Sequence, residues 1–436
     1  MSPILFYLYL AAAALIGCLC ARRIRTPDDY YVAGRRTGVI YLAGSLLATI
    51  LGSSAILGSI DMAFDRGWAG AWLLVCGAVG LLALLPLVNV VAGFRGYNLS
   101  ILIGEFYGDT VKKLSGAVIA AAWLGVIGAQ IIGAAKITSG MFGIPYAWAA
   151  VAVGITLTFY TAAGGQFSII KTDVLQVLLI FLGLLPMAVI LFIRSPSLEG
   201  ATMFSPSFGG FDLAVLLFSY SSTFLVGPDI YSRLFCAKDP GTARKAVVAT
   251  ALALVASAFL LAFIGIYGAR FYPKGSGSIL FAVAKSELPP FMTLVLYFSM
   301  LSAIMSSADT TLFTAGGLLS QFFRNRMDSS ESVRTTKYCI AALGIAAIVI
   351  AIRFDSILTV LLFALGVYAG AFVVPVLWGL LGFSCDRRYA MAAIAAGGAL
   401  ALTGKIVGGT TGNALVIAAF AVNLAVLFLG RMRERR

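Results

Sequence analysis

One apolar segment, residues 290–321, carries polar residues whose types and spacing suit an ion site. Ser306, Asp309 and Thr310 stand at i, i+3 and i+4, so on a helix they share one face. Hydroxyl and carboxylate oxygens grouped in this way suit a hard cation such as sodium. The competing interpretation is that the hydroxyls bond to carbonyls of their own helix and that the Asp lies near the cytoplasmic mouth. We favour the ion site, because a carboxylate inside an apolar helix is costly and needs a reason.

A second polar interruption lies in the apolar segment 38–61. The stretch Ala48–Ala55 places Gly52, Ser53 and Ser54 in the middle of that segment. Such small residues either form a face for close helix packing or break the helix, so that freed carbonyls face a binding cavity. The sequence leaves both interpretations open.

A third interruption joins the apolar segments 145–162 and 171–193. Gly164-Gly165 predicts a cytoplasmic turn between two helices. Asp173 then falls in the first turn of the second helix. The acid is either a cap favoured by the helix dipole or a carboxylate that lines the inner end of a cation pathway.

A weaker cluster, residues 219–223, interrupts the short apolar segment 210–226. Segments 38–61 and 210–226 would be the matching first helices of two five-helix repeats. Interrupted segments at corresponding places in two halves point to the binding site of a transporter.

The composition requires these residues to be positioned by membrane helices. Of the 436 residues, 61% are hydrophobic and 11% charged, against roughly 45–50% and 25% in soluble proteins. A soluble enzyme, a disordered protein and a nucleic-acid-binding module are therefore excluded. A membrane helix needs about 20 apolar residues, and short connections place all of the segments in a single domain, residues 1–436. We expect thirteen spans: 3–21, 38–61, 68–93, 115–138, 145–162, 171–193, 210–226, 246–270, 290–321, 336–352, 356–382, 388–405 and 411–430.

The arginines that follow segment 3–21 predict the orientation. A signal peptide has its positive charges before the apolar run, whereas here Arg22 and Arg23 come after it. This order predicts an uncleaved helix with its N-terminus outside, and thirteen spans then place the C-terminus inside. Most of the 31 Lys and Arg residues fall in the inside loops of this topology, Arg233 among them, as the positive-inside rule requires. The net charge of +13 is thus a topology signal.

The residues needed for most catalytic sites are missing from the sequence. The chain has no histidine, which removes Ser-His-Asp and Cys-His catalysis and the usual ligand of zinc and haem. It also has no Gly-x-Ser-x-Gly and no phosphate loop. We therefore expect a protein that is not an enzyme and has no organic cofactor.

Four motifs resemble those of the sodium:solute symporter family, which includes sodium/proline, sodium/glucose and sodium/pantothenate symporters. Asp-Tyr-Tyr-Val-Ala-Gly-Arg at 29–35 is similar to a family loop. Residues 160–176, with their Gly-Gly and Thr-Asp pairs, and residues 233–244 resemble two further loops. Ala-Ile-Met-Ser-Ser-Ala-Asp at 303–309 is similar to the signature of the family's eighth core helix.

The resemblance implies a fold and an activity. The fold is an all-α membrane protein with a five-plus-five inverted-repeat core and a broken first core helix. Here it would consist of an extra N-terminal helix (3–21), a first repeat (38–193), a second repeat (210–382) and two trailing helices (388–430). The activity is sodium-coupled uptake by alternating access.

The resemblance also implies the sodium ligands. Family members use two backbone carbonyls of the broken helix, which correspond to Ala48 and Leu51. A carbonyl and two hydroxyls of the eighth core helix correspond to Ala303, Ser306 and Ser307.

Some family members hold a second sodium one turn further inward. Its acid corresponds to Asp173 and its hydroxyls to positions 309 and 310. This chain has Asp309 beside Thr310 where some of those members have Ser. The three residues are therefore expected to form a second cation site or an exit path.

The first break lacks the glutamine with which the sugar-transporting branch contacts its substrate, so a sugar is disfavoured. We expect an amino acid or a monocarboxylate, with no basic residue at the midplane to pair with a carboxylate. The residues expected to line the cavity are Gly52, Ser53, Ser54, Gln130, Ser219, Tyr220 and Tyr368.

The sequence thus predicts a sodium-coupled symporter in a bacterial or archaeal cytoplasmic membrane. Its partners would be a small organic solute, sodium as the coupling ion and the lipid bilayer, with no nucleic acid. One alternative is a proton-coupled symporter that uses Asp173 and Asp309, and another is a transporter-like solute sensor.

Overall fold

The computed structural model describes residues 3–195, 202–205, 208–273, 278–354 and 357–434. The regular elements in this part of the chain are all helices, and β contacts are confined to isolated bridges. The predicted all-α membrane protein is confirmed at this level.

The elements of the first half of the chain include one broken helix and one very long one. They are α1 (Pro3–Ala21), α2 (Pro27–Val32), η1 (Ala33–Arg35), α3 (Val39–Ile50), α4 (Ser53–Arg66), η2 (Gly67–Ala71), α5 (Trp72–Ala83), α6 (Val88–Gly93), α7 (Leu99–Tyr107), α8 (Asp109–Phe142) and α9 (Tyr146–Arg194).

The second half begins with a helix that is interrupted twice. Its elements are α10 (Gly210–Leu216), the π-helix η3 (Leu217–Ser221), α11 (Ser222–Leu225), α12 (Pro228–Leu234), α13 (Pro240–Phe271), α14 (Ile279–Glu287), α15 (Pro290–Phe323), α16 (Ser330–Arg353), α17 (Ile357–Leu380), α18 (Arg387–Val407) and α19 (Gly409–Glu434).

Several of these helices are capped at their N-termini by polar side chains. These side chains accept hydrogen bonds from backbone N–H groups that have no partner within the helix. The side chains of Asn98, Asp239 and Ser329 each accept a hydrogen bond from an N–H in the first turn of α7, α13 and α16. This is the role for which Asn, Asp and Ser are favoured at helix N-termini. In α13 and α16, the residues that follow the cap are apolar for the length that a bilayer requires.

Within the described residues, eleven stretches are long and apolar enough to cross a membrane. One of them is α9, whose 49 residues would measure about 74 Å at 1.5 Å per residue. That length is more than twice a bilayer core of about 30 Å.

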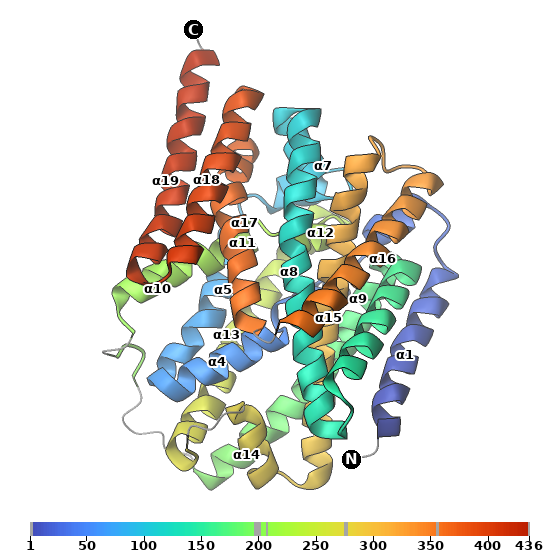
Figure 1. The fold of residues 1–436 in the computed structure, drawn as a ribbon, viewed down its shortest axis with the longest axis vertical. Helices are drawn as coiled ribbons and strands as arrows, with labels where there is room; N and C mark the ends of the chain where they lie inside the picture. The colour runs from blue at the N-terminus through green and yellow to red at the C-terminus, as the bar shows by residue number, and fades with distance from the viewer. Residues whose placement is uncertain (1–2, 196–201, 206–207, 274–277, 355–356, 435–436) are drawn as a thin grey trace.

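The helix α9 is divided at Gly165, where the predicted Gly-Gly turn lies. The backbone there is non-helical, with φ 54° and ψ −158°. Asp173 lies against α15 near Thr310, whereas Leu179 accepts a bond from Ser299, which is earlier in α15. Residues 166–194 therefore run antiparallel to α15, and both ends of α9 lie at the lower end of the molecule in Figure 1.

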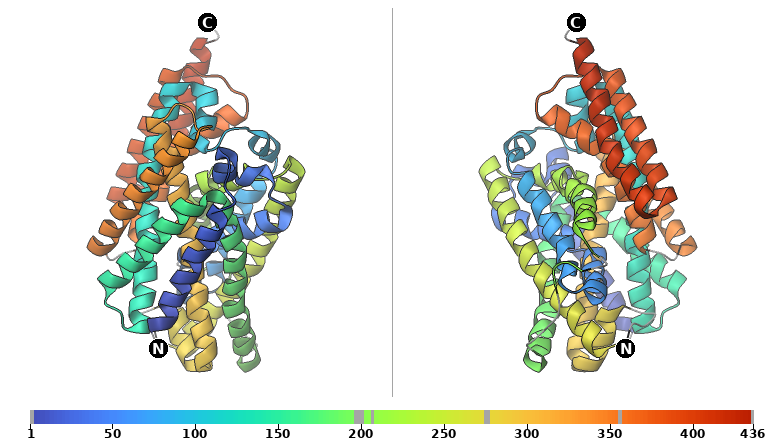
Figure 2. Two further views of the ribbon diagram at one scale, coloured as in Figure 1. Left: turned by 90° about the vertical axis from the view of Figure 1, so that its right-hand side faces the viewer. Right: turned by 90° about the vertical axis from the view of Figure 1, so that its left-hand side faces the viewer.

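The core of the molecule is α15, which packs most extensively against α9 and α8. Nearly every residue from Leu296 to Gln321 is buried, so the helix has no lipid-facing side over this length. A second group of helices forms around α13, which packs against α3, α4 and α5. The helices α18 and α19 form a neighbouring pair at one edge of the molecule (Figures 1 and 2).

The predicted end of segment 210–226 is wrong. The apolar stretch extends from Gly210 to Leu234, and Arg233, which was expected in an inside loop, is fully buried. Gly227 and Pro228 read as loop residues in the sequence. In the structure they break a helix within the protein, where neighbouring groups can satisfy the freed backbone.

Candidate functional site

The first helix break lies between α3 and α4. Leu51 ends α3 with φ −77° and ψ 40°, and Gly52 precedes α4 with an extended backbone. The last carbonyls of a helix have no intrahelical partner, so those of Ala48 and Thr49 are available to other groups. Of the two interpretations of this stretch, the helix break is the one observed.

Two hydroxyls of α15 meet these carbonyls. Ser306 Oγ donates to Ala48 O at 2.9 Å and is 3.0 Å from Ala303 O in its own helix. Ser307 Oγ donates to Thr49 O at 3.0 Å. The contacts with Ala48 and Thr49 each join residues 258 apart in sequence, so α3 and α15 lie side by side in the fold.

Gly52 makes this approach possible. A Cβ atom at this position would lie 2.4 Å from Ser307 Oγ, a distance shorter than any ordinary contact. A glycine at this position therefore leaves the space that the Ser307 hydroxyl needs to reach Thr49 O.

The expected sodium ligands thus gather at one place, with one difference. Ser306 contacts the carbonyls of Ala48 and Ala303, Ser307 meets the same break one residue further on, and Leu51 is buried at its end. The carbonyl that Ser307 meets is that of Thr49, which the resemblance did not include. These are uncharged oxygens, and they suit a monovalent hard cation.

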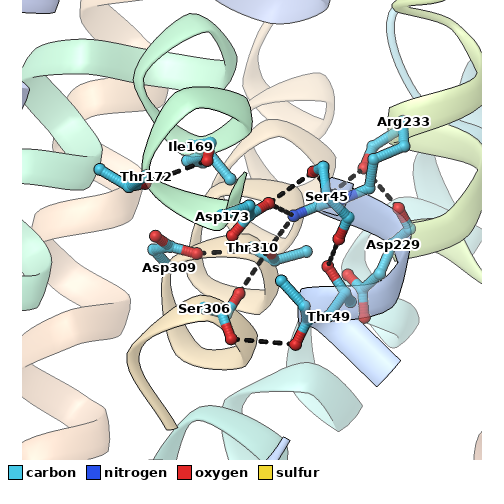
Figure 3. A network of polar contacts seen from close by, with 12 residues as sticks. Ser45, Thr49, Ile169, Thr172, Asp173, Asp229, Arg233, Ser306, Asp309 and Thr310 are labelled. Atoms are coloured by element: carbon cyan, nitrogen blue, oxygen red, sulfur yellow. Dashed lines mark hydrogen bonds and ion pairs between the residues drawn. The ribbon is translucent and has the colours of Figure 1, made fainter. Parts of the chain in front are cut away.

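One turn further along α15 lies a buried ion pair (Figure 3). Arg233 Nη2 is 3.0 Å from Asp173 Oδ2, and both side chains are 0% exposed. The same guanidinium donates to Ser45 and Thr310, and Ser45 donates to Asp173. The cluster joins α3, α9, α12 and α15.

Asp309 lies next to this cluster. Tyr160 donates to Asp309 Oδ2 at 2.9 Å, and Thr310 Oγ1 is 3.3 Å from the other carboxylate oxygen. The structure thus brings Asp173, Asp309 and Thr310 together, as expected, and adds Arg233, which was not.

One expectation about this region is wrong. Asp173 is not a cap in a first turn, because the second half of α9 begins directly after Gly165, about two turns earlier. The sequence also did not indicate that Arg233 is buried inside the bundle, where it pairs with Asp173. Ser45 was also missed, although it stands one helical turn before Thr49, in the broken segment.

At the second helix break, Val226 and Gly227, tyrosine hydroxyls donate hydrogen bonds to backbone carbonyls that the helix leaves without a partner. Val226 has non-helical φ −134° and ψ 66°, and Tyr368 donates to its carbonyl at 2.5 Å. Tyr231 donates to Leu225 O at 3.0 Å. The break lies a few residues beyond the predicted interruption at 219–223, which instead forms most of the π-helix η3.

Between the two breaks lies a cavity of about 100 Å³. Four of the expected cavity residues line it, together with the sodium-site residues Thr49 and Ser307 and several residues that sequence reasoning missed. The four are Gly52, Ser54, Gln130 and Tyr220, and the missed residues include Trp123, Phe224 and Asp229.

The other expected cavity residues have different roles. Ser53 lines a separate cavity of about 940 Å³. Ser219 donates to Val215 O within its own helix. Tyr368 is buried against Trp123 and supports the second break.

Comparisons with known proteins agree with this architecture. The sequence pattern of the sodium:solute symporter family matches residues 30–205. The chain is 26% identical over 195 residues to the sodium/pantothenate symporter of Escherichia coli (strain K12), covering 42% of this chain and 39% of that relative. It is 23% identical over 296 residues to the uncharacterized symporter YwcA of Bacillus subtilis (strain 168), covering 62% of this chain and 57% of that relative. Each match therefore spans less than two thirds of the relative's own length.

Solved structures show the same fold at lower identity. A Na⁺-coupled sialic acid symporter in a substrate-bound outward-open state gives a TM-score of 0.80 at 16% identity, covering 98% of this chain and 96% of that one. Mhp1, a nucleobase-cation-symport-1 family transporter in a closed conformation, gives 0.64 at 16% identity, covering 94% and 96%.

The chain is thus an integral multi-pass membrane protein with the fold of secondary transporters. Residues 30–205 match the sodium:solute symporter family, which its motifs resemble, and the proteins that the chain matches are transporters and not enzymes.

Proposed function

We propose that this chain is a sodium-coupled symporter that takes up a small organic solute by alternating access. The observation that carries the proposal is the meeting of Ser306 and Ser307 with the carbonyls of Ala48 and Thr49 at a helix break. Sodium, as a transported ion, would lie among these oxygens together with the carbonyls of Leu51 and Ala303. Hydroxyls and free carbonyls at a broken helix are how transporters of this architecture bind their coupling ion.

We further propose thirteen crossings, with the N-terminus outside and the C-terminus inside. Three observations support this topology. The helix α9 is long enough for two crossings and turns at Gly165. The two helix breaks lie in the first helices of the two proposed repeats, 38–193 and 210–382. The chain termini lie at opposite ends of the molecule (Figures 1 and 2), as an odd number of crossings requires.

The two sides of the proposed site differ in access. The larger cavity, lined by Ser53, Phe64 and Tyr297 among others, lies beside α14, which is an outer element in this topology. It reaches the first helix break, since Ser53 follows Gly52. On the opposite side, the ion pair of Arg233 and Asp173 closes the bundle. We infer an outward-facing state, from which the solute and sodium would be released when this ion pair opens.

The solute is proposed to be an amino acid or a monocarboxylate rather than a sugar. The cavity between the breaks, about 100 Å³, is small beside the ~300–1,000 Å³ of pockets that hold drug-sized ligands. A compact solute therefore fits this site better than a sugar.

The ion site is tested by deleting its hydroxyls in the purified protein. Ser306→Ala together with Ser307→Ala should abolish both the thermal stabilisation by sodium over potassium and sodium-driven uptake into proteoliposomes. The matched control is Ser299→Ala, because Ser299 also donates from α15 to a carbonyl of a neighbouring helix, at 2.7 Å, but lies two turns away. A sodium response that survives in the double variant contradicts the site, and uptake that is absent in the wild type favours a sensor.

One observation favours proton coupling as a second candidate. Asp173 and Asp309 lie beside a single buried cation, Arg233, so one of the two carboxylates lacks a full counter-charge. Uptake driven by a pH gradient in sodium-free buffer, and lost in Asp309→Asn, would support this candidate over sodium.

A further inference from the structure

Asp229 lies in the first turn of α12, directly after the second helix break, in a stretch that the sequence predicts to be a loop. It lines the cavity of about 100 Å³ between the two breaks, and its residue is half-buried rather than sealed. Trp123 Nε1 donates to its two oxygens at 3.0 and 2.9 Å. A single N–H satisfies only part of a carboxylate, which offers about four lone-pair sites.

Asp229 forms no ion pair within the described residues. The charge of Arg233, one helical turn further along α12, acts on Asp229, but its guanidinium is directed to Asp173, Thr310, Ser45 and Ser232. A charged side chain inside a membrane protein is costly unless it is paired, so a cationic group of a bound solute would stabilise Asp229.

The walls around Asp229 are of the kind that binds an ammonium group. The same cavity is lined by Trp123, Tyr220 and Phe224. The rings of Tyr220 and Phe224 pack edge to face, with their centroids 4.9 Å apart. Aromatic faces attract cations, and a carboxylate accepts hydrogen bonds from a protonated amine.

The opposite wall of the cavity has the reverse character. Ser307 and Thr49 of the proposed sodium site line it, so bound sodium would place a positive charge there. A solute in this cavity therefore meets a carboxylate at one end and a cation at the other.

We propose that Asp229 binds the protonated amine of the transported solute, which makes the substrate a compact amino acid rather than a monocarboxylate. This inference rests on the proposed symport and specifies its substrate class. It accounts for a carboxylate that has no ion-pair partner among the described residues, and it assigns the aromatic residues beside that carboxylate a role in substrate binding.

The test compares Asp229→Asn with the wild type, using solutes that differ by one group. Each amino acid of a panel is matched with its deaminated acid and its decarboxylated amine, as in alanine, propionate and ethylamine. Binding is measured by thermal stabilisation in sodium and in potassium. The wild type should bind an amino acid at least about tenfold more tightly than the matching acid, and Asp229→Asn should lose this preference while sodium alone still stabilises it. A matched control is Asp212→Asn, which removes a carboxylate near the surface of α10.

A second measurement does not depend on finding the substrate. Asn keeps an oxygen that accepts from Trp123 and removes the charge, so solute-free Asp229→Asn should melt at a higher temperature than the wild type. A lower melting temperature would make Asp229 a structural acceptor for Trp123 and overturn the inference. So would an unchanged preference for the amino acid, or a panel in which acids bind as well as amino acids.

The outcomes separate the two proposals. If sodium fails to stabilise even the wild type, the symport proposal fails. If the sodium response is present in the wild type and disappears in Asp229→Asn, then Asp229 belongs to the ion site and the amine assignment fails alone.

Discussion

Gly52 allows the helix break to pack closely against α15. Gly52→Ala would place a methyl group 2.4 Å from Ser307 Oγ, so the Ser307 side chain has to rotate or the two helices have to separate. We expect the variant to fold and to lose most of its sodium response, because the hydroxyl of Ser307 moves away from Thr49 O. Thermal stability in sodium and in potassium measures this loss.

Gly58→Ala, in α4, serves as the control for Gly52→Ala. A Cβ at Gly58 would meet only Leu73 Cδ2, at 3.4 Å, which is close to an ordinary contact. An equal loss of sodium response in both variants would show that α4 is merely sensitive to added volume.

At the scale of elements, the buried Arg233 holds α12 against α3, α9 and α15. Arg233→Met should lower the free energy of unfolding by about 3–5 kcal/mol, because it leaves the charge of Asp173 buried without a counter-charge. Arg233→Met with Asp173→Asn should recover most of this loss, since neither charge then remains. Denaturant or thermal unfolding in detergent measures both effects.

The control is an ion pair at the surface. Arg326 and Asp328 are 3.8 Å apart with their side chains 86% and 56% exposed, and pairs of this kind contribute about 0–1 kcal/mol. Arg326→Ala should therefore change stability little. A similar small effect for Arg233→Met would mean that the buried cluster does not hold these helices together.

At the scale of the whole molecule, the proposed cargo decides how uptake responds to voltage. A zwitterionic amino acid with one sodium carries one net positive charge inward, which gains about 2.3 kcal/mol per 100 mV. A tenfold sodium gradient adds about 1.4 kcal/mol. An inside-negative potential should therefore accelerate amino acid uptake into proteoliposomes, and a valinomycin-imposed potassium gradient provides that potential. Voltage-independent uptake would contradict a single sodium moving with a zwitterion.

The sequence by itself determined the membrane class, the positions of the apolar helices and most of the proposed sodium residues. Long apolar runs identify membrane helices through their length alone. Hydroxyls in the middle of such runs are rare enough to mark Ser306 and Ser307. Gly52, among small polar residues, left a helix break open as one of two interpretations, and Gly165 indicated a turn.

Only the tertiary structure decided where Asp229 and Arg233 lie and which residues line the cavity. Hydropathy averages over neighbours along the chain, so a break rich in Gly, Pro and charges looks like a loop. Whether its polar groups face water or the interior depends on helices distant in sequence: α3, α9 and α15 surround Arg233, and Trp123 of α8 contacts Asp229. For the same reason, Ser219 and Tyr368 looked like cavity residues, but each donates to a backbone carbonyl. Partners of this kind are set by packing, which local sequence does not record.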